Sequence, residues 1–137
     1  MILRRIGAVI LGLAVAWLIV AAAEAGVHHL YPPLAGTDMH DFAAVKSYVA
    51  NLPLAAFVLV LVGWLFGAFA GVFIATTVGR GALPGYILGV LLLAAGIVNA
   101  VMIPQPVWFS AFSLLIYIVA TVVGVKIGQG AIPSVAE

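Results

Sequence analysis

Glu24 is the residue whose type and position most clearly suggest chemistry. It lies near the end of the first long apolar segment, and no other Asp or Glu lies within or at the edge of such a segment. His28 follows four residues later, so the two side chains share one face if a helix continues that far. An ionisable group at membrane depth is costly and is therefore a functional hypothesis by default. Glu24 is a candidate for proton coupling, for cation binding, or for a structural hydrogen bond to His28, a loop amide or Asn99.

Asn99 is the second polar residue placed deep in an apolar segment. Its amide carries donors and acceptors that hydrocarbon does not satisfy, and its position near a segment end puts it level with Glu24. Glu24, His28 and Asn99 are thus the predicted polar or ligand site. The alternatives are a hydrogen-bonded end of a helix bundle and a small ligand pocket open to the outer leaflet.

A metal site is a further alternative, and it would combine Glu24 with side chains of the loop that follows the first segment: His28 or His29, and His40 or Asp41. Neither an HExxH nor a CxxC spacing is present, and the chain has no Cys. We therefore predict no metal and no cofactor.

Catalytic motifs are also missing from the sequence. It contains no G-x-S-x-G elbow, phosphate loop or dinucleotide fingerprint. Ser110, Ser113 and Thr121 are best interpreted as packing hydroxyls bonded to backbone carbonyls. We expect no catalytic residues and a non-enzymatic protein.

The elements that must position these side chains follow from composition. Of 137 residues, 66% are hydrophobic and 7% are charged, which excludes a soluble globule and a disordered chain. A net charge of +1 with scattered cations gives nucleic-acid binding no support. A span needs about 20 apolar residues, and four segments qualify: residues 6–25, 54–77, 83–103 and 107–127. The predicted fold is all-α, a single integral membrane domain (residues 1–137) forming an antiparallel four-helix bundle.

One connection is long enough to hold structure of its own, and it covers residues 26–52. Met39, Phe42, Val45 and Val49 recur at helical spacing, with Thr37 or Asp38 as a possible cap. We predict a short amphipathic helix over residues 38–50 that lies on the membrane face, with a plain coil as the alternative.

The cations predict the orientation. Four of the five Lys and Arg (Arg4, Arg5, Arg80 and Lys126) fall on one side of the predicted bundle, and Lys46 falls on the other. The positive-inside rule places both termini in the cytoplasm and the long loop outside, in a cell inner membrane. The first segment could instead be a cleaved signal peptide, but its apolar part exceeds the 7–15 residues typical of one.

Rows of small residues predict how the helices pack, because helices in lipid associate through close contact and hydrogen bonds. The second predicted span (residues 54–77) has glycines spaced four residues apart, and the third and fourth spans (83–103 and 107–127) carry similar stripes of small residues. The glycines assigned to helix packing are Gly63, Gly67, Gly71, Gly85, Gly89, Gly96 and Gly124. Packing within one bundle is one interpretation, and homo-oligomerisation or a glycine-lined path is the other.

The length of the chain and its four predicted spans are similar to those of the small multidrug transporters, which have an essential Glu in span one. Here the acid is at the far end of that span, the first loop is long and the charges are asymmetric, so that activity is not carried over. The Tyr31-Pro32-Pro33 run, the glycine row of span two and the segment from Asn99 to Trp108 resemble uncharacterised small bacterial membrane proteins. That resemblance implies no activity.

The sequence therefore favours a membrane protein that acts as an assembly partner, a scaffold or a lipid-ligand binder. Its expected partners are the lipid bilayer and another copy of the chain or another membrane protein. The alternatives are a small proton- or cation-coupled transporter or channel that uses Glu24, and a protein with an outer-face metal site.

Overall fold

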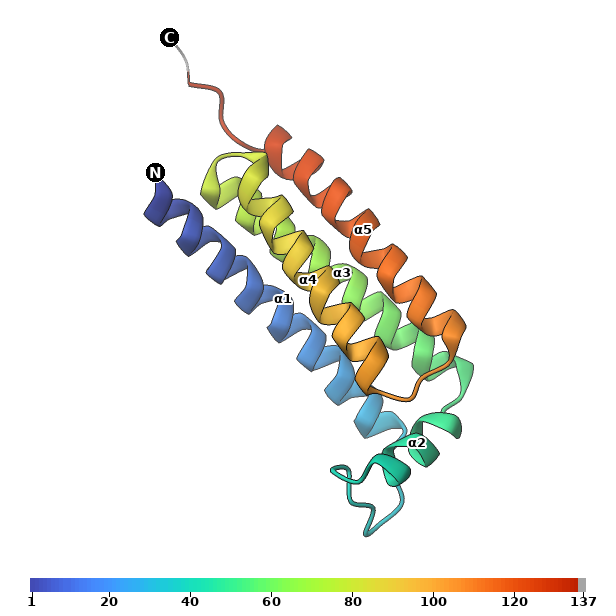
Figure 1. The fold of residues 1–137 in the computed structure, drawn as a ribbon. Coiled ribbons are helices and arrows are strands. Elements are labelled where there is room, and N and C mark those ends of the chain that lie inside the picture. Colours follow the sequence, from blue (N-terminus) through green and yellow to red (C-terminus); the bar gives the residue numbers. More distant parts are fainter. Residues whose placement is uncertain (136–137) are drawn as a thin grey trace.

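The computed structural model describes residues 1–135 and is a bundle of helices (Figure 1). The elements, in chain order, are α1 (Ile2–Leu30), α2 (Phe42–Ala50), α3 (Leu54–Gly79), α4 (Ala82–Met102) and α5 (Val107–Gly130). The predicted all-α fold is confirmed, and within the described part of the chain there is no strand. Four of the helices, all except α2, are long and apolar enough to cross a membrane.

The two ends of the bundle differ in what they carry. Both termini and the short turn between α3 and α4 lie at one end, here called the terminal end (Figure 1). The opposite end, called the α2 end, carries α2 and the turn between α4 and α5. Arg80 ends α3 in the left-handed conformation, with φ 52° and ψ 53°, which allows the chain to reverse within a few residues.

Helix α1 is longer than predicted, because it continues past residue 25 to Leu30. Gly26 does not break the helix. The helix ends before Pro32 because a residue that precedes proline is disfavoured in the helical conformation, and Tyr31 is extended in φ at −128°. His28 therefore lies on the helix rather than in the loop.

Helix α2 is shorter than predicted, and it begins at Phe42 rather than at residue 38. The residues before it form a turn in which the His40 amide donates to Asp38 Oδ1 at 2.9 Å. A local side-chain bond of this kind competes with the helical hydrogen bonds. Neither Thr37 nor Asp38 caps the helix; Asp41 is at the N-cap position and makes no side-chain capping bond.

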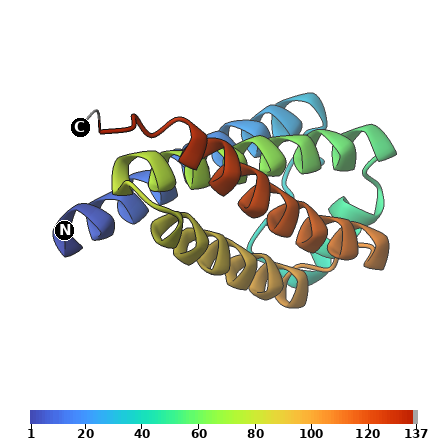
Figure 2. The ribbon, with the colours of Figure 1, turned by 90° about the horizontal axis from the view of Figure 1, so that it is seen from above.

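Helix α3 is the centre of the bundle, and it contacts α1, α4 and α5. Figure 2 shows that α1 and α4 lie close at the terminal end and diverge toward the α2 end. Where they are close, a Cβ added at Gly12 of α1 would lie 2.7 Å from Leu88 Cδ2 of α4.

Glycines bring α1 and α3 into backbone contact. A Cβ at Gly71 would lie 2.6 Å from the Gly12 carbonyl oxygen, and one at Gly67 would lie 3.0 Å from the Ala16 carbonyl oxygen. A Cβ at Gly63 would collide with the Cβ of Ala23. Since packing between backbones is a main source of helix association in lipid, this row holds α1 on α3.

The other glycines named from the sequence also lie against helices of the same chain. The contacts are Gly85 with Thr76, Gly89 with Thr121, Gly96 with the Tyr117 ring, and Gly124 with Val72. The glycine faces of α4 and α5 are therefore covered by other helices of the same chain.

Candidate functional site

The side chain of Glu24 is paired with a tryptophan from the neighbouring helix. Trp64 Nε1 donates a hydrogen bond to Glu24 Oε1 at 3.0 Å. The indole is buried, with 6% of its surface exposed, whereas Glu24 is exposed. Ala23 and Gly63, which precede the two residues in sequence, are in direct contact. The closest approach of α1 and α3 at this level thus places carboxylate and indole together.

Aromatic rings of α5 hold the indole from its other side. Trp64 packs against Phe109, with ring centroids 5.4 Å apart, and is stacked on Tyr117 at 6.0 Å with an interplanar angle of 18°. Phe57 continues the cluster, 5.1 Å from Phe109. Aromatic pairs of this geometry contribute beyond simple burial, so the N–H donated to Glu24 has a fixed direction.

Glu24 and Trp64 line a cavity of about 280 Å³ at the α2 end, called here the Glu24 crevice. All five helices contribute to it, and most of its lining side chains are apolar. The lining residues are Glu24, Val27, His28, Met39, Val45, Tyr48, Val49, Leu52, Ala56, Phe57, Val60, Trp64, Asn99, Ile103, Gln105 and Phe109.

Helix α2 forms one wall of the crevice and is anchored through Tyr48. The Tyr48 hydroxyl donates to the Tyr31 carbonyl oxygen at 2.7 Å, and its ring lies 5.4 Å from that of His28. Burial raises the pKa of Tyr48 above its ordinary value of 10.0. The phenol therefore remains a hydrogen-bond donor at neutral pH.

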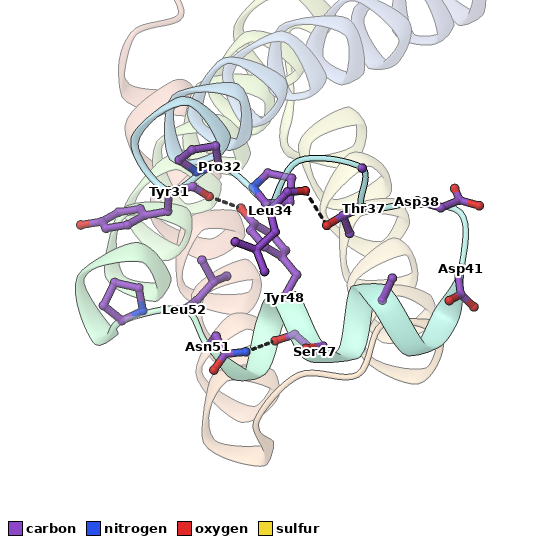
Figure 3. A pocket seen from close by; sticks show the side chains of 14 residues that line it. Tyr31, Pro32, Leu34, Thr37, Asp38, Asp41, Ser47, Tyr48, Asn51 and Leu52 are labelled. Atoms are coloured by element: carbon purple, nitrogen blue, oxygen red, sulfur yellow. Dashed lines mark hydrogen bonds between the residues drawn. The ribbon is translucent and has the colours of Figure 1, made fainter.

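A second, wider cavity lies between α2 and the loop that follows α1 (Figure 3). It has a volume of about 770 Å³ and includes the side chains of Asp38, Asp41 and Asn51. Tyr48 and Leu52 line both cavities. The two cavities therefore adjoin each other at these two side chains.

Two amides add polarity to the Glu24 crevice near the α4–α5 turn. Asn99 lines the crevice and is half-buried. Gln105 donates from Nε2 to Ser110 Oγ at 2.9 Å, which leaves its carbonyl oxygen without a partner among the described residues. Both amides belong to the same polar layer as Glu24.

The structure brings the three predicted polar residues to one cavity, but it gives Glu24 a different partner. No hydrogen bond joins Glu24 to His28, to Asn99 or to a loop amide in residues 1–135. His28 instead packs against Tyr48. Sequence reasoning missed Trp64 as the partner; the spacing of Phe57 and Trp64, seven residues apart, places both on one face of α3 but does not link that face to Glu24.

The side chains considered as metal ligands are dispersed, and two of the three hydroxyls considered as nucleophiles donate to backbone carbonyls. Among the described residues, no three His, Cys, Asp or Glu side chains are grouped to hold a metal ion. Ser113 donates to the Ser110 carbonyl at 2.7 Å and Thr121 donates to the Tyr117 carbonyl at 2.6 Å, as the sequence interpretation expects. The Ser110 hydroxyl instead accepts from Gln105 Nε2. The distinctive polar arrangement is therefore the Glu24–Trp64 pair.

Comparisons with known proteins add no family. No family model, curated protein or solved structure matches the chain. The resemblance to small bacterial membrane proteins stays a prediction. What the structure establishes is a small all-α membrane protein with four helices capable of spanning the bilayer.

Proposed function

We propose that this protein is a non-enzymatic, multi-pass membrane protein that binds a small amphiphilic ligand in the Glu24 crevice. The observation that carries the proposal is an exposed carboxylate, bonded to Trp64, at the wall of a cavity whose lining is mostly apolar. Ligand sites are mostly apolar with a few placed polar groups that orient the ligand. The polar part of an amphiphile would face Glu24, and its apolar part would lie against the aromatic rings.

The proposed orientation puts this site in the outer leaflet of a cell inner membrane. The terminal end carries Arg80 and Lys126, so the positive-inside rule assigns it to the cytoplasm. The α2 end is then outside, and the crevice, which lies at that end, is on the outer side of the membrane. A ligand dissolved in the outer leaflet reaches the crevice without crossing the membrane.

Trp64 provides a direct test, because it lines the crevice and is otherwise shielded from lipid. A variant with Trp17→Phe and Trp108→Phe leaves Trp64 as the only tryptophan. In phosphatidylcholine vesicles, we expect chain-brominated dodecyl amphiphiles to quench Trp64 fluorescence and to reach saturation, with at least one of an ammonium, a trimethylammonium, a hydroxyl or a sulfate head group.

Two further substitutions in α3 make the test specific. Val60 lines the crevice, so Val60→Phe should fill the space and remove the saturable quenching. Val62 is 43% exposed on the bundle surface, so Val62→Phe is the matched control and should keep it. Quenching that never saturates with any of the four head groups, or that is unaffected by Val60→Phe, would overturn the proposal.

A second candidate function is proton- or cation-coupled transport through Glu24, because this is the one acidic side chain in the four long helices. Below the crevice, however, the contacts of Gly67 with Ala16 and of Gly71 with Gly12 close α1 onto α3. That closure favours a binding site over a conduit within one chain. Reconstituted flux that is present in the wild type and lost in Glu24→Gln would favour the transporter.

A further inference from the structure

The geometry points to a single-chain primary amine as the ligand of the Glu24 crevice, with its ammonium group on the Glu24 carboxylate. This inference rests on the proposed function and adds the chemical class of the head group. It follows from the charge, the hydrogen-bonding groups and the size of the crevice.

The charge of the lining is negative. Glu24 is its only acidic residue, and neither Lys nor Arg lines the crevice. The one polar partner of Glu24 within residues 1–135 is the neutral indole N–H, which occupies Oε1 and leaves Oε2 without a hydrogen bond. A carboxylate at membrane depth is stabilised by a cation far more than by a neutral donor. A ligand that brings one positive charge supplies what the protein does not.

The hydrogen-bonding groups favour N–H donors. Besides Glu24 Oε2, the crevice offers the carbonyl oxygen of Gln105, for which the described residues provide no hydrogen-bond donor while Nε2 donates to Ser110. The Asn99 amide adds one acceptor oxygen, together with its N–H donors, in the same cavity. A primary ammonium has three donors, whereas a trimethylammonium has none. The acceptors of this cavity therefore match a primary amine better than a quaternary one.

The walls and the volume limit the rest of the ligand. Trp64, Phe57 and Phe109 present aromatic surface, which attracts both an alkyl chain and an adjacent cation. A cavity of about 280 Å³ accepts a head group and the start of one chain, since pockets for whole drug-sized ligands measure about 300–1,000 Å³. An ethanolamine phospholipid also carries a primary ammonium, but its phosphate would meet no Lys or Arg in the lining. These features favour a simple amine over a zwitterionic lipid.

The test uses the variant with Trp64 as the only tryptophan, in phosphatidylcholine vesicles at neutral pH. Chain-brominated dodecylamine should half-saturate the quenching at a membrane fraction about tenfold or more below that of the brominated alcohol, the size expected for one charged hydrogen bond. The trimethylammonium compound should fall between them, and the sulfate should be weakest. In Glu24→Gln, the amine should lose its advantage while the alcohol binds as before.

Each other outcome is informative. Equal binding of all head groups, or tightest binding of the sulfate, would overturn the amine assignment and leave the proposed function standing. Trimethylammonium binding as tight as that of the amine would overturn the role of N–H donors. A brominated lysophosphatidylethanolamine that matches the amine would replace it as the ligand. If Glu24→Gln does not fold, the order of head-group affinities measured with Glu24 present decides the amine assignment by itself. If no amphiphile gives saturable quenching, the proposed function itself is rejected.

Discussion

At the scale of single residues, the Glu24–Trp64 hydrogen bond joins a charged group to a buried donor. The indole is 6% exposed and packs against Phe109 and Tyr117, so its N–H is a buried donor whose acceptor is the Glu24 carboxylate. Leaving a buried donor unsatisfied costs about 1–3 kcal/mol. The acceptor at position 24 therefore has a structural role, and in the proposed function it also binds the ligand.

Substitutions at Glu24 separate these two roles. Glu24→Gln keeps a carbonyl acceptor for Trp64, so the loss in unfolding free energy should be about 1 kcal/mol or less. Glu24→Leu removes the acceptor and should cost about 1–3 kcal/mol. Denaturant unfolding in detergent, followed by circular dichroism, measures both, and Trp64→Phe is the control in which the two Glu24 variants should become alike. Equal destabilisation by Gln and Leu in the Trp64 background would show that the hydrogen bond is not what Glu24 contributes.

At the scale of elements, the α1–α3 contact sets the geometry of the site. Gly63, Gly67 and Gly71 lie on one stripe of α3, and each meets a small residue or a backbone atom of α1. Larger residues anywhere in this row would move α1 outward. Such a shift would also separate Ala23 from Gly63, and with them Glu24 from Trp64.

Gly71→Ala tests this contact against a matched control, Gly7→Ala. The new Cβ at residue 71 would press on the Gly12 carbonyl oxygen, which is backbone and does not rotate away, whereas a Cβ at residue 7 meets nothing within 4 Å. Gly71→Ala should therefore lower the unfolding free energy by about 1–3 kcal/mol through overpacking. Gly7→Ala should be neutral or stabilising by up to about 1 kcal/mol, because alanine favours a helix. Similar effects of the two changes, measured by the same unfolding experiment, would contradict the stripe as a contact.

At the scale of the whole molecule, the two ends of the bundle carry different charge. Arg4, Arg5, Arg80 and Lys126 are at the terminal end, and the acidic residues of the described chain are Glu24, Asp38 and Asp41, all toward the α2 end. A bundle of this kind has one favoured orientation in a membrane that follows the positive-inside rule.

Labelling of introduced cysteines tests that orientation. The chain has no Cys, so Asp38→Cys and Arg80→Cys each create a single thiol, and both positions are exposed. A membrane-impermeant maleimide added to intact cells should modify residue 38 and spare residue 80 until the membrane is permeabilised. Modification of residue 80 but not of residue 38 in intact cells would reverse the proposed topology, and with it the leaflet from which a ligand enters.

Composition and spacing alone determine the architecture of this protein. Segments of about 20 apolar residues admit few structures other than spanning helices, because hydrocarbon satisfies no backbone polar group. Prolines and glycines mark where helices end, and period-four glycines mark contact faces. The bounds of α1 and α2 differ from expectation because helix ends depend on local competition, such as the Asp38–His40 bond that delays the start of α2.

The composition of the site was decided by tertiary structure. Sequence identifies Glu24, His28 and Asn99 as unusual, since polar groups in apolar segments stand out. It does not identify Trp64 as the partner of Glu24, because the two are 40 residues apart and meet only where Gly63 lets α1 approach α3. Helical periodicity reports which residues share a face of one helix, whereas the depth and rotation of one helix against another depend on the packing of side chains at every level of their contact.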